Sequence, residues 1–228
     1  MTLVKICGVT NLEDALLCVE AGADMLGFNF YPRSPRYVEP EVAREITARL
    51  PAPVVGVGVF VNEESPRRVE ELASLANVAA VQLHGDEPAA YCRALRGRFV
   101  IKALRVSADF AAESASAYET QAVLLDAYSR DLYGGTGDVF DWSAARRARA
   151  LVPQLFLAGG LGPHNVAEAV RAVAPYAVDA CSLLERAPGL KDAERVRAFV
   201  AAVRRADAAE ASSASVPSSA DSSEREAR

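Results

Sequence analysis

The sequence has few of the residues that metal enzymes and disulfide-rich proteins require. Its 228 residues include only two histidines, His84 and His164, and four cysteines with no Cys-x-x-Cys pair. No pair of histidines accompanied by carboxylates follows a predicted strand, so a metal-dependent epimerase or hydrolase is not expected and no metal is predicted. The cysteines are scattered along the chain, which favours reduced thiols over a disulfide framework.

The sequence also lacks the charge blocks and apolar runs of nucleic-acid-binding and membrane proteins. The formal net charge is −5, and Lys and Arg form no block, so neither a nucleic acid nor an anionic membrane is expected as a partner. The N-terminal residues MTLVKICGV contain no basic segment followed by a long apolar one, and no run of about 18 apolar residues occurs. We therefore expect a cytoplasmic protein.

Short apolar runs alternate with amphipathic segments along most of the chain. Apolar residues make up 51% of the sequence, which is enough for a large core. The runs predict strands at 3–9, 25–30, 53–60, 79–85, 98–106, 121–128, 154–160 and 176–184. Helices are predicted at 11–23, 39–50, 65–76, 86–97, from about 107, and at 141–152, 162–174 and 191–206.

Eight strand–helix units in a chain of this length predict an α/β fold, a closed (β/α)8 barrel of the TIM type in a single domain. The strands are continuous Val, Ile and Leu runs, as expected for a parallel sheet that is covered on both faces. An open doubly wound sheet is the alternative, and its first turn would be expected to carry Gly-x-Gly-x-x-Gly. The first strand is followed by ICGVTN instead, so the barrel is preferred.

The composition changes near the C-terminus. Residues 208–228 are rich in Ser and Ala and contain no large aliphatic or aromatic side chain apart from one valine. We expect residues 1–207 to form the barrel and residues 208–228 to form a disordered tail.

In such a barrel, the active site lies where the strands end at their carboxyl side. Gly159 and Gly160 follow the seventh predicted strand, and Ser182 lies at the matching position near the end of the eighth. Backbone N–H groups in these two loops are a known way to bind phosphate, although a Gly-Gly pair can also be a simple turn. The segment YPRSPRYV after the second strand holds two arginines, Arg33 and Arg36, each directly after a proline, where an arginine suits a carboxylate or is part of an exposed turn.

Several motifs at these strand ends resemble the phosphoribosylanthranilate isomerase family. They are KICGVTNLEDA, GFNFYPRSPRYV, VGVFVN, VQLHGDE, KALRV, LLDAYSRDLYGGTGDVFDW, LAGGLGPHNV and VDACSLLERAPGLKD. The resemblance covers residues 3 to about 205. It implies an isomerase of tryptophan biosynthesis that needs no cofactor. Such an enzyme converts N-(5-phosphoribosyl)anthranilate to 1-(2-carboxyphenylamino)-1-deoxyribulose 5-phosphate by an Amadori rearrangement.

The resemblance also implies roles for individual residues. Asp126 would be the general acid and Cys7 the general base. Arg36 would hold the anthranilate carboxylate, and the loops with Gly159, Gly160 and Ser182 would hold the phosphate. For His84, shaping the substrate pocket and capping the fourth helix are equally open.

One segment departs from the family pattern. CSLLE stands where the family usually has a Ser-Ser-Gly stretch, so Leu183 replaces a glycine and its side chain is expected to affect the phosphate loop. Cys181 is expected to point into the barrel wall. The sequence does not distinguish a monomer from a homodimer.

Overall fold

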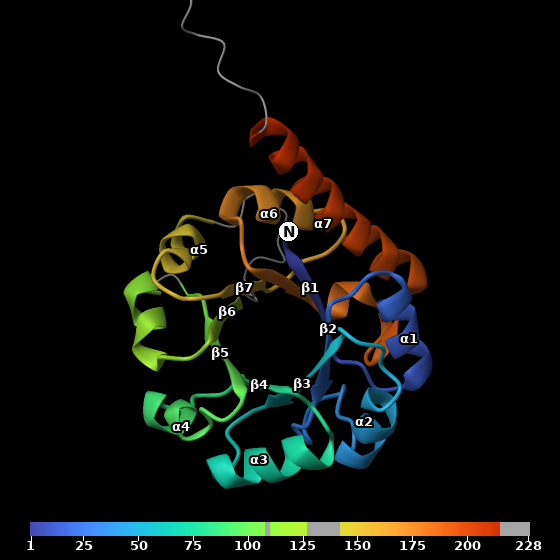
Figure 1. The fold of residues 1–228 in the computed structure, drawn as a ribbon, viewed down its shortest axis with the longest axis vertical. Coiled ribbons are helices and arrows are strands. Elements are labelled where there is room, and N and C mark those ends of the chain that lie inside the picture. Colours follow the sequence, from blue (N-terminus) through green and yellow to red (C-terminus); the bar gives the residue numbers. More distant parts are fainter. Residues whose placement is uncertain (108–109, 127–141, 215–228) are drawn as a thin grey trace, which may run out of the picture.

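The computed structural model describes residues 1–107, 110–126 and 142–214, and it shows the predicted closed barrel (Figure 1). Eight parallel strands follow one another around the barrel in chain order, and the last pairs with the first. They are β1 (Leu3–Cys7), β2 (Met25–Asn29), β3 (Val55–Phe60), β4 (Ala80–Leu83), β5 (Phe99–Arg105), β6 (Ala122–Asp126), β7 (Leu155–Ala158) and β8 (Ala177–Ala180).

Helices surround this barrel on the outside, as Figure 1 shows. They are α1 (Leu12–Glu20), α2 (Pro40–Thr47), α3 (Pro66–Leu75), α4 (Ala89–Ala94), α5 (Trp142–Arg149), α6 (Val166–Val173) and α7 (Ala193–Ala214). Two of the predicted helix starts are confirmed in detail. Asn11 accepts a hydrogen bond from the backbone N–H of Asp14, and Ser65 accepts one from Arg68.

The segment after β5 differs from the predicted α-helix. It forms a 3-10 helix, η1 (Ala112–Tyr118). The hydroxyls of Ser114 and Ser116 donate to the carbonyl oxygens three residues earlier, Ala111 and Glu113. Hydroxyls bonded to nearby backbone carbonyls compete with α-helical pairing, which accounts for the tighter helix.

Side chains alternate between the inside and the outside of the barrel, although the strands are apolar throughout. In β1, Val4 and Ile6 pack outward against the helices, whereas Lys5 and Cys7 lie on the opposite face of the strand, toward the interior. A separate apolar cluster fills the interior; it comprises Met25, Val57, Ala80, Ile101, Ala103, Ala122, Leu124, Phe156, Ala158 and Ala177. The interior is therefore a packed core, with polar residues where the strands end.

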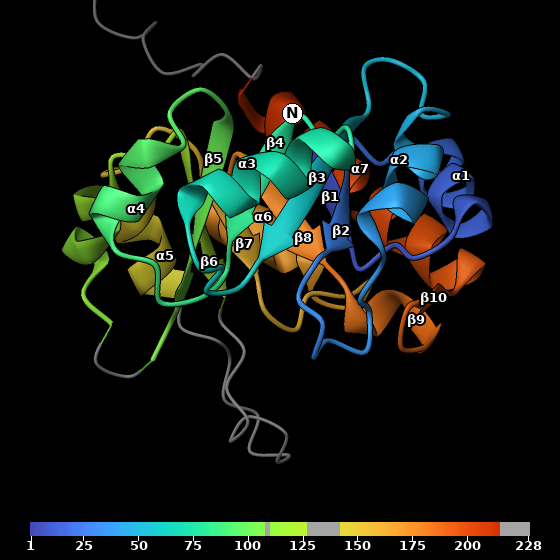
Figure 2. The ribbon, with the colours of Figure 1, turned by 90° about the horizontal axis from the view of Figure 1, so that it is seen from below.

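The eighth strand is shorter than predicted. β8 ends at Ala180, and a short 3-10 helix η3 (Ser182–Leu184) leads into the hairpin of β9 (Glu185–Ala187) and β10 (Leu190–Lys191). Figure 2 shows this hairpin at the lower edge of the barrel, opposite the edge where the N-terminus lies. The lower edge in that view is the one where the strands end.

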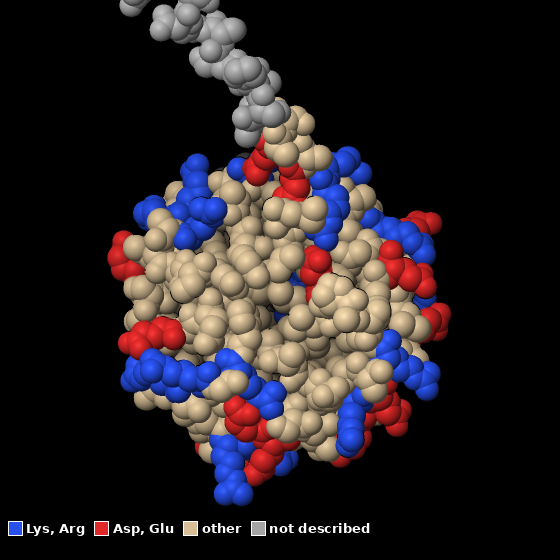
Figure 3. Space-filling view, viewed as in Figure 1, with Lys and Arg blue, Asp and Glu red and all other residues tan. Residues whose placement is uncertain are grey.

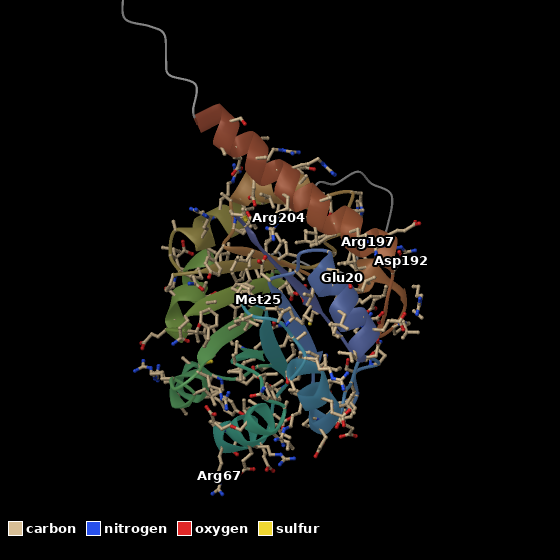
Figure 4. The ribbon with its side chains drawn as sticks, turned by 45° about the vertical axis from the view of Figure 1, so that its right-hand side comes forward. Glu20, Met25, Arg67, Asp192, Arg197 and Arg204 are labelled. Carbon is tan, nitrogen blue, oxygen red and sulfur yellow. The ribbon has the colours of Figure 1, made fainter. Side chains whose placement is uncertain are left out.

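The final helix extends beyond the predicted start of the tail at residue 208. α7 continues to Ala214, beyond residue 207, because alanine is the strongest helix former and this stretch contains several. Asp207 fastens this part of α7 to the first strand, since its carboxylate accepts hydrogen bonds from Thr2 N at 2.9 Å and Thr2 Oγ1 at 2.8 Å. Arg204 donates to the carbonyl of Thr2 and, as Figure 4 shows, extends from α7 toward the barrel. The predicted tail residues 215–228 lie outside the described residues.

The face seen in Figures 1 and 3 carries its charges at the edge. Lys and Arg are interspersed with Asp and Glu around the circumference, and uncharged residues cover most of the centre (Figure 3). In the parts of the chain that are described, no helix is both long enough and apolar enough to cross a membrane.

Candidate functional site

A cavity of about 260 Å³ opens where the strands end. All seven residues predicted for the site line it: Cys7, Arg36, His84, Asp126, Gly159, Gly160 and Ser182. They come from six different strand ends or the loops that follow them. Barrel closure therefore brings together residues that are up to 175 positions apart in the sequence.

Cys7 is the last residue of β1, and the backbone turns sharply after it. Gly8 has φ of 74°, a conformation that favours glycine. A Cβ at Gly8 would lie 2.7 Å from Cδ of Arg36 and 2.9 Å from Sγ of Cys181, so a side chain there would also collide with two site residues. Gly8 thus allows Arg36 and Cys181 to lie close to Cys7.

Asp126, the last residue of β6, is joined to β4 by a chain of hydrogen bonds. Nε2 of Gln82 lies 2.8 Å from Nδ1 of His84, and Nε2 of His84 lies 3.2 Å from Oδ2 of Asp126. An amide N–H can only donate, so Nδ1 of His84 accepts, and the proton of the neutral imidazole lies on Nε2 and is donated to Asp126. His84 therefore orients the Asp126 side chain.

His84 does not cap the fourth helix; its side chain lines the cavity instead. α4 begins at Ala89, with Pro88 before it. The loop that carries His84 is held by Lys102, whose Nζ donates to the carbonyl of Gly85 at 2.6 Å and to Oε2 of Glu87 at 2.7 Å. The ammonium and carboxylate of this pair are almost completely buried, which makes the loop a rigid support for the imidazole.

Arg36 lies at the edge of the cavity and is held by a residue from the hairpin after β8. Its Nε and Nη2 donate to the carboxylate of Glu185 at 2.6–3.0 Å. Oε1 of Glu185 also accepts from Nζ of Lys191 at 2.9 Å. Burial opposes ionisation of Glu185, but these two cations outweigh it and lower the pKa of Glu185. Among the described residues, no hydrogen bond engages Nη1 of Arg36.

The loops after β7 and β8 leave backbone exposed to the cavity. Gly159 and Gly160 have φ of 89° and 64°, and an added Cβ at Gly160 would meet no atom within 4 Å. Asn165 fixes this loop, because its side chain accepts from Gly162 N at 2.8 Å and donates to Gly160 O at 2.9 Å. The exposed Ser182, at the start of η3, lines the same cavity.

Leu183 packs against this loop. A Cβ at Gly162 would lie 3.1 Å from Cδ1 of Leu183, so the leucine side chain occupies the space beside Gly162, whereas the space beside Gly160 is open.

Sequence reasoning missed a buried ion pair beneath Cys7. Nζ of Lys5 lies 2.9 Å from Oδ2 of Asp179, and Lys5 is fully buried. Burial alone would lower the pKa of Lys5, but Asp179 and Cys7 raise it. Burial also raises the pKa of Asp179, to about 7, against the opposing effect of Lys5. The alternation of side chains along β1 places Lys5 on the same face as Cys7 and was the signal for this pair.

The prediction that Cys181 points into the barrel wall is wrong. Cys181 lines the cavity together with Cys7 because β8 ends one residue earlier, at Ala180, and the chain then turns into η3. The other two cysteines are buried on helices, as predicted. Burial raises the pKa of Cys18 to about 12, which makes its thiol inert at neutral pH.

Two buried oxygens at the cavity have no hydrogen-bond partner among the described residues. They are Oε1 of Gln82 and Oδ1 of Asp179. Buried acceptors are normally satisfied, so these two favour a ligand with hydroxyl donors. No group of three or more His, Cys, Asp or Glu suited to a metal ion occurs within residues 1–107, 110–126 and 142–214.

Comparisons with known proteins agree with this geometry. A family model described as N-(5'phosphoribosyl)anthranilate (PRA) isomerase matches residues 4–202. The N-(5'-phosphoribosyl)anthranilate isomerase of Geobacter sulfurreducens is 53% identical over 200 residues, which are 88% of this chain and 97% of that protein. The enzyme of the same name from Trichlorobacter lovleyi is 51% identical over 200 residues, with the same coverage.

Solved structures give the same result. Phosphoribosyl anthranilate isomerase from Thermotoga maritima superimposes with a TM-score of 0.83 at 48% identity, covering 90% of this chain and 100% of that one. A phosphoribosyl anthranilate isomerase in complex with reduced 1-(o-carboxyphenylamino)-1-deoxyribulose 5-phosphate has a TM-score of 0.81 at 45% identity, with equal coverage. This chain belongs to the phosphoribosylanthranilate isomerase family.

Proposed function

We propose that this protein isomerises N-(5-phosphoribosyl)anthranilate to 1-(2-carboxyphenylamino)-1-deoxyribulose 5-phosphate in tryptophan biosynthesis. The observation that supports this most is the presence of Cys7 and Asp126 in one cavity whose rim carries the glycine loop after β7. The rearrangement needs a base, an acid and a phosphate site. The cavity offers a candidate for each.

Asp126 serves as the general acid in this proposal. It gives its proton to the oxygen of the furanose ring as the bond between that oxygen and C1′ breaks, and the nitrogen lone pair forms the C1′=N bond of a Schiff base. The hydrogen bond from His84 at 3.2 Å supports this role because it fixes the direction in which the carboxyl group faces.

Cys7 serves as the general base. Its thiolate removes the proton from C2′, and the electrons of that bond form C1′=C2′ while the C1′=N pair returns to nitrogen. The resulting enolamine becomes the ketone when the proton of the C2′ hydroxyl is lost and C1′ gains one. Cys7 ends the step as a neutral thiol and must lose its proton before the next turnover.

The remaining residues of the cavity bind the substrate. The backbone at Gly159 and Gly160, together with Ser182, faces the phosphate, and the unpartnered oxygens of Gln82 and Asp179 accept hydrogen bonds from the sugar hydroxyls. Arg36 faces the anthranilate carboxylate with its Nη1 while Glu185 holds the other side of the guanidinium.

Two other functions are less well supported. An isomerase of the imidazole pathway would be expected to have a carboxylate base at the end of β1, where this chain has Cys7. A barrel that only binds a phosphometabolite would not need an acid and a base in one cavity. The solved Thermotoga maritima relative is called dimeric. For this chain we propose a cytoplasmic monomer or homodimer with no cofactor and no nucleic-acid or membrane partner.

The test supplies the substrate in situ from anthranilate and phosphoribosyl pyrophosphate with the corresponding transferase. The fluorescence of phosphoribosylanthranilate should decay at a rate proportional to the concentration of this protein. Decay no faster than the uncatalysed reaction at micromolar protein would overturn the proposed function.

A further inference from the structure

Cys7 and Cys181 lie side by side at the ends of neighbouring strands. β1 and β8 pair in a register that sets Lys5 opposite Asp179 and Ile6 opposite Ala180, and the residue that follows Ile6 and the residue that follows Ala180 are both cysteines. Both cysteines line the cavity, and a Cβ built on Gly8, the residue after Cys7, would lie only 2.9 Å from Sγ of Cys181. The proximity of the two thiols is therefore fixed by the closure of the barrel.

Two acceptors lie near the Cys181 thiol. One is the neighbouring sulfur of Cys7, and the other is Oε1 of Glu185, to which the Cys181 thiol donates at 3.7 Å. That oxygen already accepts from Nε of Arg36 at 2.9 Å and from Nζ of Lys191 at 2.9 Å. Because Oε1 of Glu185 already accepts hydrogen bonds from two cations, a hydrogen bond from the Cys181 thiol stabilises Glu185 less than it stabilises a thiolate at Cys7.

A buried ammonium group lies on another side of the Cys7 sulfur. A Cβ built on Gly27 would lie 2.8 Å from Sγ of Cys7 and 3.1 Å from Nζ of Lys5. Both atoms therefore lie next to the Gly27 backbone, where a larger residue would place its side chain. Lys5 is also bound to Asp179, whose carboxylate balances the ammonium charge. The cation therefore favours the thiolate only in part, which leaves a role for a neutral hydrogen-bond donor.

Charged and titratable groups act on Cys7 from several elements of the barrel. They are Lys5 of β1, Asp179 of β8, Lys191 of β10, Arg36 after β2 and His84 after β4, and two further carboxylates, Glu185 of β9 and Asp126 of β6, are bonded to members of this group. Lys5 and Asp179 form one ion pair, Lys191 and Arg36 share Glu185, and His84 bonds Asp126. Each cation among these side chains thus has a carboxylate partner, although Lys191 and Arg36 share one, whereas the Cys181 thiol is a neutral donor beside Cys7.

We propose that Cys181 is a positioning residue for the isomerisation, whose thiol donates a hydrogen bond to the Cys7 sulfur and keeps Cys7 available as the thiolate. This rests on the proposed role of Cys7 as the base. A hydrogen bond to the charged form of a group favours that form. In agreement, the pKa of Cys7 lies well below its ordinary value. The bond from Cys181 lowers it most, Lys5 and Lys191 lower it further, and burial opposes them. The same bond, together with burial, raises the pKa of Cys181.

The test measures the rate at which iodoacetamide alkylates Cys7 between about pH 5 and 10. Peptide mass spectrometry locates the label, and a phosphine reductant keeps both thiols reduced. In C181A the inflection should move upward by about one to two pH units, since a hydrogen bond to a charged group is lost. C181S keeps a donor at this position, so its profile should stay close to that of the unaltered protein.

Cys92 provides a matched control, because it is buried on α4 away from the cavity, and C92A should leave the Cys7 profile unchanged. If C181A does not fold, Cys181→Val fills the same space without a donor and takes its place. An unmoved inflection in C181A, or a shift in C181S as large as that in C181A, would overturn the proposal.

The pH dependence of turnover provides a second measurement, and it would not change if the role of Cys181 were purely structural. The acid limb of kcat/KM should shift upward in C181A with little change in KM at alkaline pH. If the unaltered protein does not isomerise phosphoribosylanthranilate, the proposed function fails, and the alkylation profile still decides the role of Cys181. If it does and C181A matches it at every pH, the role of Cys181 alone fails.

Discussion

Nε2 of His84 lies 3.2 Å from Oδ2 of Asp126, and Nδ1 of the same ring lies 2.8 Å from the amide nitrogen of Gln82. The imidazole thus connects a residue buried in the barrel to a carboxyl group at the cavity. Its orientation is set from both sides, and that orientation in turn restrains Asp126.

Replacing His84 should therefore impair the acid step more than substrate binding. We expect H84A to lower kcat about 10- to 100-fold, with a smaller change in KM, because Asp126 becomes a carboxylate as it gives up its proton and the hydrogen bond from His84 to that charged group is lost. H84Q retains an N–H donor and should recover part of the loss. Steady-state kinetics with phosphoribosylanthranilate would measure both. Equal kcat in H84A and the unaltered protein would show that His84 does not orient Asp126.

Arg36 is expected to act on binding instead. R36M removes the guanidinium that we propose binds the anthranilate carboxylate, so KM should rise about tenfold or more while kcat falls less. R36K keeps the charge but not the planar fork that Glu185 holds, and should be intermediate. An unchanged KM in R36M would place the carboxylate elsewhere in the cavity.

The buried pair of Lys102 and Glu87 should matter for stability. Both side chains are at most 2% exposed, so K102M leaves a carboxylate buried without its cation and should cost about 3–5 kcal/mol. The exposed pair of Arg67 and Glu71 is the matched control, and R67A should cost less than about 1 kcal/mol. Urea unfolding measures both variants. Similar losses in the two would contradict the structural importance of the buried pair.

The end of α7 supplies a prediction about truncation. Removing residues 207–228 deletes Asp207, which binds both N and Oγ1 of Thr2, so the free energy of unfolding should fall by about 1.5–3 kcal/mol while turnover persists. A chain that ends at Ala214 keeps this contact and should match the full-length protein in stability. Equal stability of the two truncated chains would show that the link between α7 and β1 contributes nothing.

The barrel was predictable because its pattern is local. Each strand is a short apolar run, and each helix start has its own signal, as Asn11 and Ser65 show. The ends of elements were less predictable. Residues 181–184 continue the apolar run of β8 in sequence but turn into η3 in the structure, which moved Cys181 from the wall to the cavity.

The groups that support the site were not predictable in the same way. Arg36 and Glu185 are 149 positions apart, and Lys5 and Asp179 are 174 apart. No periodicity connects such residues, since only the closure of β8 against β1 and the hairpin after β8 bring them together. The candidate residues that bind substrate could be named from strand ends, whereas the ion pairs behind them required the structure.

The most direct test of the central claim is the turnover number of Cys7 and Asp126 variants with phosphoribosylanthranilate. C7A and D126N should each lower kcat by about 10²- to 10⁴-fold, because each removes one side of the acid–base pair, while circular dichroism shows the fold retained. C18A, which alters a buried helix cysteine away from the cavity, should keep nearly full activity. If either C7A or D126N turned over substrate at the rate of C18A, the assignment of Cys7 as base and Asp126 as acid would be contradicted.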